Sequence, residues 1–169
     1  MKKNKSLLFV AVSLIAIGLI GMSVLFYFSN SRTLSTRSFS SLGEQIYNTG
    51  RGEDGKLISF SSGPHWMSMH GGSCASCHGK KGKGDIRVDM TDEIAPAITW
   101  DALVKGEHEH KDEEKNHKDE HQPYNEETVK KAIIEGKNPS GDSLNSAMPR
   151  WKMNDKEVKE VIKFLKTLD

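Results

Sequence analysis

The sequence has almost no excess charge of either sign, because 24 basic and 23 acidic side chains in 169 residues leave a formal net charge of +1. That balance gives no argument for nucleic acid or a polyanionic substrate as the partner, since proteins bind both through an excess of basic side chains, and we expect no nucleic acid partner. The alternation of polar and apolar residues that is typical of a β-strand is scarce, and no internal repeat is present. The length has room for one small domain with additional segments.

Charge is also absent from the 22 residues between Leu7 and Phe28. A helix of that length covers a hydrocarbon core of about 30 Å at about 1.5 Å per residue. The segment is longer than the apolar part of a signal peptide, and no small-residue cleavage site follows it. We therefore expect a retained single-pass membrane anchor rather than a cleaved leader or a buried core helix. No cysteine follows directly, which excludes a lipoprotein anchor.

Basic side chains precede this apolar segment, at Lys2, Lys3 and Lys5. The positive-inside rule therefore places the amino terminus in the cytoplasm and everything after residue 28 on the periplasmic, extracytoplasmic side.

Composition divides the chain into three parts: a tip and anchor at residues 1–28, a linker rich in Ser and Thr at 29–42, and one domain at 43–169. Residues 105–121 within the domain contain no large apolar side chain, so we interpret them as a solvated, charged insertion. Four histidines lie in it, and metal binding there stays an open alternative: His108, His110, His117 and His121.

Short helices joined by long loops are expected in the domain, over residues 43–48, around Cys74, and over 97–105 and 126–135. The last helix is the clearest, because Val158, Val161, Ile162 and Leu165 recur at helical spacing. Asn154 or Asp155 is expected to cap its amino terminus.

Both cysteines of the chain lie in one five-residue pattern, Cys74-Ala75-Ser76-Cys77-His78, which is typical of covalent attachment of a c-type haem. On a helical turn Cys74 shares a face with Cys77 and His78. Two thiols can then meet the two vinyl groups of a haem while the imidazole reaches the iron. A disulfide is possible in an exported chain but leaves His78 without a role. A zinc site needs about four ligands and would have to recruit two further histidines.

Over roughly residues 43–169 the chain resembles the class I cytochrome c family. The resemblance rests on Gly43 and Tyr47 in the first helix, the CASCHG motif, the loop with Ala147, Met148, Pro149 and Trp151, and Phe164 in the last helix. It implies an all-α fold in which several short helices surround one covalently bound haem c, preceded here by the single transmembrane helix.

The resemblance also implies roles for individual residues. Met148, 70 residues beyond His78, would take the second axial position on the iron. The carbonyl of Pro96 would accept the ring N–H of His78, although a simple turn is an alternative. Trp151 would donate its indole N–H toward a haem propionate or only pack against the haem.

Other side chains remain alternatives to Met148 as the second axial ligand, because core packing is the usual role of a methionine. They are Met67, Met69, Met90, Met153, His65 and His70.

These features predict a membrane-tethered electron carrier, with or without a place in an oxidoreductase complex, and not an enzyme, because both axial positions of the iron would be filled by protein. Two alternatives stay open: a haem-based sensor or ligand-binding protein with a displaceable axial ligand, and a structural or metal-handling subunit of a membrane complex. The expected partners are redox proteins, membrane-bound or soluble. Positive charge at Lys80, Lys81 and Lys83 would steer an acidic partner, unless these lysines only form a soluble turn.

Two segments depart from the family pattern, and one of them is the insertion at 105–121. Between Tyr47 and Cys74 stand 26 residues, 48–73, where the family usually has a short link. They are expected to form either a flap over the haem edge or a surface for a partner.

Overall fold

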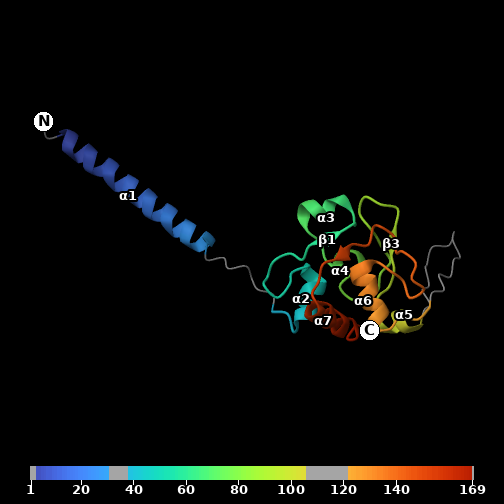
Figure 1. The fold of residues 1–169 in the computed structure, drawn as a ribbon. Helices are drawn as coiled ribbons and strands as arrows, with labels where there is room; N and C mark the ends of the chain where they lie inside the picture. Colours follow the sequence, from blue (N-terminus) through green and yellow to red (C-terminus); the bar gives the residue numbers. More distant parts are fainter. Residues whose placement is uncertain (1–2, 31–37, 106–121, 169) are drawn as a thin grey trace. The chain divides into compact units, whose positions relative to one another are not determined.

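The computed structural model of this protein describes residues 3–30, 38–105 and 122–168 (Figure 1). The chain divides into two compact units, Met1–Ser38 and Phe39–Asp169. The four histidines of the insertion at 105–121 lie outside the described residues, as do residues 31–37 of the linker.

The first unit contains the helix α1 (Lys3–Asn30). The hydroxyls of Ser13 and Ser23 donate to the carbonyls of Phe9 and Leu19 one turn earlier, which satisfies these polar groups within the helix. Among the residues that the structure describes, no helix is long and apolar enough to cross a membrane.

The second unit is mainly helical. Its helices are α2 (Leu42–Thr49), α3 (His65–His70), α4 (Cys74–His78), α5 (Trp100–Lys105), α6 (Glu126–Glu135) and α7 (Asp155–Leu165). Helices α2 and α7 lie side by side and build the centre of the core (Figure 1). Gly43 makes their close approach possible, because a Cβ at this position would lie 1.9 Å from the carbonyl oxygen of Glu160. Four side chains are at most 1% exposed there: Ile46, Tyr47, Val158 and Val161.

Local capping explains where the longer helices begin and end. Asn125 and Thr128 form a capping box at the start of α6, and Asn154 and Glu157 form one at the start of α7. Helix α6 ends at Gly136, whose φ of 66° is in the left-handed region. The expected bounds of α6 therefore agree with the structure.

The expectation of an all-α fold needs a correction, because the second unit also contains short strands. Strand β1 (Phe60–Ser61) pairs antiparallel with β4 (Arg150–Trp151), and β2 (Ile86–Arg87) pairs antiparallel with β3 (Ile94–Ala95). Each strand has two residues, too few for any alternation of side chains to be visible in the sequence. They form because backbone groups of loops that pack on one another need hydrogen-bond partners.

The segment at 48–73 is part of the folded core. It contains β1 and α3, neither of which the sequence pattern predicted. Ile58 and Met67 from this segment are buried in the same cluster as the side chains of α2 and α7. The segment therefore contributes side chains to the hydrophobic core of the domain.

Candidate functional site

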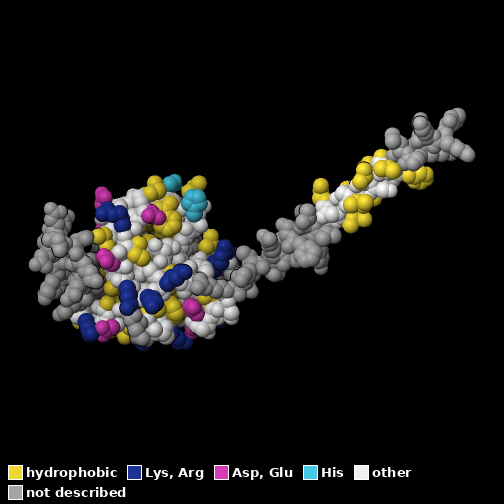
Figure 2. Space-filling model, turned by 180° about the vertical axis from the view of Figure 1, so that it is seen from behind, with side chains coloured by type: hydrophobic (Ala, Val, Ile, Leu, Met, Phe, Trp, Pro, Cys, Tyr) yellow, Lys and Arg dark blue, Asp and Glu magenta, His cyan; other side chains and the backbone are white. Residues whose placement is uncertain are grey.

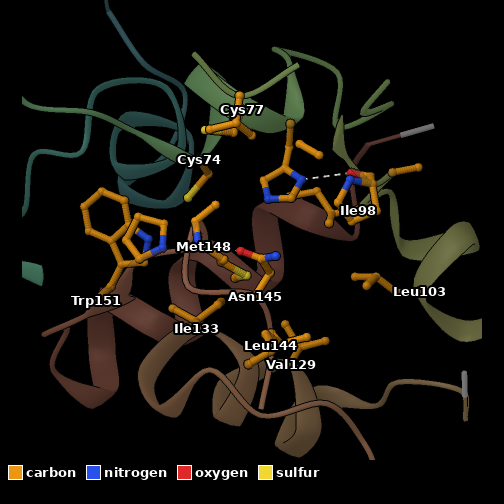
Figure 3. A pocket seen from close by; sticks show the side chains of 18 of the residues that line it. Cys74, Cys77, Ile98, Leu103, Val129, Ile133, Leu144, Asn145, Met148 and Trp151 are labelled. Carbon is orange, nitrogen blue, oxygen red and sulfur yellow. Dashed lines mark hydrogen bonds between the residues drawn. The ribbon is translucent and has the colours of Figure 1, made fainter. Parts of the chain in front are cut away.

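A cavity of about 460 Å³ lies within the second unit, and its walls are mostly apolar (Figure 3). Cys74, Cys77 and His78 of α4 line one part of it, and Met148 and Trp151 line another. Figure 3 shows the two cysteines on one side of the view and Met148 with residues of α6 on the other. The volume is in the range of sites for organic cofactors, about 300–1,000 Å³.

Helix α4 presents the cysteines from a single capped turn. Ser73 and Ser76 form a capping box at its start, with the Ser73 N–H donating to the Ser76 hydroxyl over 3.1 Å. Both cysteines are free thiols, so the structure contains no disulfide between them. Burial raises the pKa of Cys74 to about 12 and also raises the pKa of Cys77. Both thiols therefore stay protonated at neutral pH.

His78 is buried, with 8% of its surface exposed, at the end of α4. Its Nδ1 lies 2.8 Å from the carbonyl oxygen of Pro96, along the dashed line in Figure 3. Since a carbonyl only accepts, Nδ1 carries the proton and Nε2 keeps a free lone pair. Burial lowers the pKa of His78, which favours the neutral imidazole that binds metals.

The backbone of the glycine-rich loop brings Pro96 to His78. Gly84 donates its N–H to the carbonyl of His78 over 3.0 Å. Its φ is 64°, and a Cβ there would lie 2.3 Å from the carbonyl carbon of Pro96. Only glycine fits such a close approach. Tyr47 fixes the same turn from α2, since its hydroxyl donates to the carbonyl of Gly79 over 2.6 Å.

Met148 comes from the loop between α6 and β4 and lines the same cavity. The segment at 48–73 holds this loop, because the N–H of Gly63 donates to the carbonyl of Ser146 over 2.8 Å. Pro149 is buried beside it. A Cβ at Gly63 would lie 3.1 Å from Cγ of Pro149.

The other candidates for an axial position differ in their placement. Met67 is 1% exposed and also lines the cavity. Met69 and Met90 are 70% and 81% exposed, and Met153 packs against the core. His65 and His70 are exposed and do not line the cavity; Figure 2 shows histidine atoms at the surface beside hydrophobic side chains.

Trp151 is only 4% exposed and lies between the cavity and the segment at 48–73. Its ring is tilted against that of Phe60, with the ring centroids 5.3 Å apart. None of the hydrogen bonds among the described residues involves its indole N–H. Within the described part of the chain the Trp151 side chain therefore packs against its neighbours.

Several residues of the cavity wall were not predicted from the sequence to line a cofactor site. Val88 and Ala95 come from the β2–β3 hairpin, and Val129 and Ile133 come from α6. The helical spacing of the apolar residues in α6 could have indicated Val129 and Ile133, whereas the sequence of the β2–β3 hairpin contains no such pattern. Among the described residues no three side chains of His, Cys, Asp or Glu gather in a way that could hold a metal ion.

Comparison with known proteins gave one match. A family model described as Cytochrome c matches residues 67–169, which include α4, the cavity walls and the loop with Met148. Searches of the curated proteins and of the solved structures found no match to the chain.

Proposed function

The chain belongs to the cytochrome c family, and we propose that it is a membrane-tethered carrier of single electrons rather than an enzyme. Membership of the family brings one covalently bound haem c with iron and a role in electron transfer. The observation that carries the finer proposal is the cavity of about 460 Å³ that the thiols, the imidazole and a thioether share.

The residues present fit this group. Two free thiols and a neutral imidazole come from one helical turn, as attachment through both vinyl groups and the iron requires. The surrounding wall is mainly apolar, which suits a porphyrin face. We therefore assign Cys74 and Cys77 to the covalent bonds and His78 to the iron, with Pro96 as the acceptor that orients its ring.

Met148 is proposed as the second axial ligand. It lines the cavity from a loop that β1 and Gly63 hold in place. Met67 also lines the cavity, but it is fixed in the core, where Gly72 and Gly63 lie against it. The haem supplies the one-electron chemistry of its iron when bound. If His78 and Met148 both held the iron, no position would stay open for a substrate, and this arrangement would favour a carrier.

Tethering to a membrane is proposed on the sequence, through the uncharged stretch from Leu7 to Phe28 behind three lysines. It would leave the amino terminus in the cytoplasm and the haem domain on the extracytoplasmic side. Extraction of membranes with alkaline carbonate tests this, because the full chain should stay in the pellet. A variant without residues 1–28 but with a cleavable export signal should be released, and retention of that variant would contradict the proposal.

A redox protein with an acidic docking surface is the proposed partner, membrane-bound or soluble. Lys80, Lys81 and Lys83 follow the haem-binding turn directly and are all exposed. The lysines beside α4 therefore support steering toward the edge of the haem.

The experiment that tests the function is a redox-titrated absorption spectrum of the full chain, purified from a host that matures c-type cytochromes. We expect a pyridine haemochrome of haem c, pigment that stays with the protein in acidified organic solvent, and a weak sulfur-to-iron band in the near infrared. Met148→Ala should abolish that band, and Met69→Ala, an exposed methionine, is the matched control.

Two outcomes would contradict the proposal. Extractable pigment would overturn the covalent attachment. Fast binding of carbon monoxide to the reduced wild-type protein would favour a ligand-binding haem protein, because it requires a free or readily displaced axial position.

A further inference from the structure

The guanidinium of Arg150 donates hydrogen bonds to three backbone carbonyls of the loop that carries Met148. Its Nη2 donates to the carbonyl of Leu144 over 2.7 Å, and its Nη1 donates to the carbonyl of Asn145 over 3.0 Å and to that of Met148. Arg150 itself is partly buried, in strand β4. One side chain therefore holds both ends of the five-residue segment 144–148.

This segment has few bonds of its own. Within it, Met148 donates its N–H to the carbonyl of Asn145 over 3.1 Å, and Ala147 donates to the Asn145 side chain over 2.8 Å. The carbonyls that converge on Arg150 are acceptors only, so they cannot satisfy one another. The planar guanidinium offers five N–H donors in a fixed fork, whereas the ammonium of a lysine is a compact point charge.

The end of α6 leaves space for this guanidinium. A Cβ at Gly136 would lie 2.0 Å from Nε and 2.2 Å from Cζ of Arg150. Gly136 also has a φ of 66°, and its carbonyl accepts from the N–H of Leu144 over 2.8 Å. Glycine at position 136 therefore leaves room for the guanidinium of Arg150, which a larger residue there would displace.

We infer that Arg150 is a positioning residue for the axial methionine: its contacts with the three carbonyls fix the backbone of Met148 and keep other ligands from replacing the thioether. This inference rests on the proposed function. It predicts that loss of the guanidinium hydrogen bonds shifts the loop at 144–148 toward open conformations, in which small ligands reach the iron.

The test uses the full-length, haem-loaded protein with Arg150→Lys and Arg150→Gln. In the oxidised state, imidazole is titrated while the sulfur-to-iron band is followed, and in the reduced state the rate of carbon monoxide binding is measured. Both variants should bind imidazole at least about tenfold more tightly and carbon monoxide at least about tenfold faster, because even one lost charge-assisted hydrogen bond changes the open fraction by such a factor. Arg51→Gln is the matched control, since Arg51 is exposed and donates to Gly55.

Gly136→Ala is a second test, because it keeps Arg150 but places a methyl group in the space that the guanidinium occupies. It should increase ligand binding in the same direction, with haem content and helical circular dichroism as checks of folding. If only Arg150→Gln changes ligand binding while Arg150→Lys behaves as wild type, charge rather than the fork matters and the inference is overturned.

Wild-type behaviour of all three variants would also overturn it. That result leaves the proposed function intact as long as Met148→Ala abolishes the band. A wild-type protein without the band would overturn both, so the two failures are distinguishable.

Discussion

The backbone N–H of Gly63 donates a 2.8 Å hydrogen bond to the carbonyl of Ser146, two residues before Met148. Next to this bond, β1 pairs with β4, and Lys152 donates its N–H to the carbonyl of Ser59 over 2.8 Å. The extra segment at 48–73 is therefore fastened to the loop that carries the proposed axial ligand. A chain with a short link in its place would leave these backbone groups of the loop to water.

Phe60→Ala should weaken the contact between the segment at 48–73 and the loop that carries Met148. The substitution removes a ring that packs against Trp151 at 5.3 Å between centroids, and we expect a loss of about 2 kcal/mol in the free energy of unfolding. Denaturant titration of the haem-loaded protein measures it. Leu57→Ala, at a side chain that is 49% exposed in the same segment, is the control. Equal midpoints for the two variants would show that the contact does not hold the segment.

Gly43→Ala should disturb the contact between α2 and α7. The new methyl group would lie 1.9 Å from the backbone oxygen of Glu160, which cannot rotate away as a side chain does. Separating the helices should cost about 1–3 kcal/mol. Thermal unfolding followed by circular dichroism measures the effect, with exposed Lys159→Ala on α7 as the control. A melting temperature equal to that of the control would argue against close packing at this point.

The parts of the site that depend on local sequence could be predicted. The Cys74–His78 turn needs only neighbours three and four residues apart, and the pattern of α7 extends over three turns. The start of the helix expected at 97–105 was wrong by three residues. Thr99 accepts the N–H of Ala102 over 3.3 Å, which fixes the start at Trp100.

The parts that depend on distant segments could not be predicted. Phe60 pairs with Trp151, and the guanidinium of Arg150 lies against Gly136. These residues are far apart in the sequence, and local periodicity does not indicate which distant segments meet. Helix α3 has only six residues, too short for a hydrophobic period to be visible. Arg150 in particular looks like a surface residue of a polar loop until the carbonyls around it are known.

Acid should weaken the contact between α6 and α7, in part through the ion pair of Lys130 and Asp155. A hydrogen bond from Lys130 holds the pKa of Asp155 below its usual value of 3.8. Stability from this pair is therefore present above the usual pKa and is lost as the pH falls through the lowered one. Both groups are exposed, so the effect is small.

Denaturant midpoints between pH 6 and pH 2 measure this effect. The difference between wild type and Asp155→Asn should shrink toward pH 2, and Lys130→Gln should give the same profile. A difference that stays constant over this range would mean that the pair contributes nothing to the pH dependence.

Trp151→Phe separates the two roles that the sequence left open for this residue. Phenylalanine keeps the aromatic packing against Phe60 but removes the indole N–H, which has no partner among the described residues. If that N–H neutralises part of the charge of a haem propionate, its loss should lower the reduction potential without changing the near-infrared band. Potentiometric titration measures it, with Trp100→Phe, outside the cavity wall, as the control. A potential equal to that of the control would leave packing as its role.

The lysines beside the haem-binding turn should govern how electron transfer depends on salt. Lys80 and Lys83 are exposed in the loop just after α4. Exposed charges act on a docking partner over about 8–10 Å at physiological ionic strength. The double variant Lys80→Gln/Lys83→Gln should slow electron transfer to an acidic redox protein at low salt and flatten the plot of log rate against ionic strength, because fewer charges are screened. Stopped-flow kinetics measure both effects. Lys156→Gln/Lys159→Gln removes the same charge from α7, so equal slopes for the two double variants would mean that net charge, rather than the position of these lysines, guides the partner.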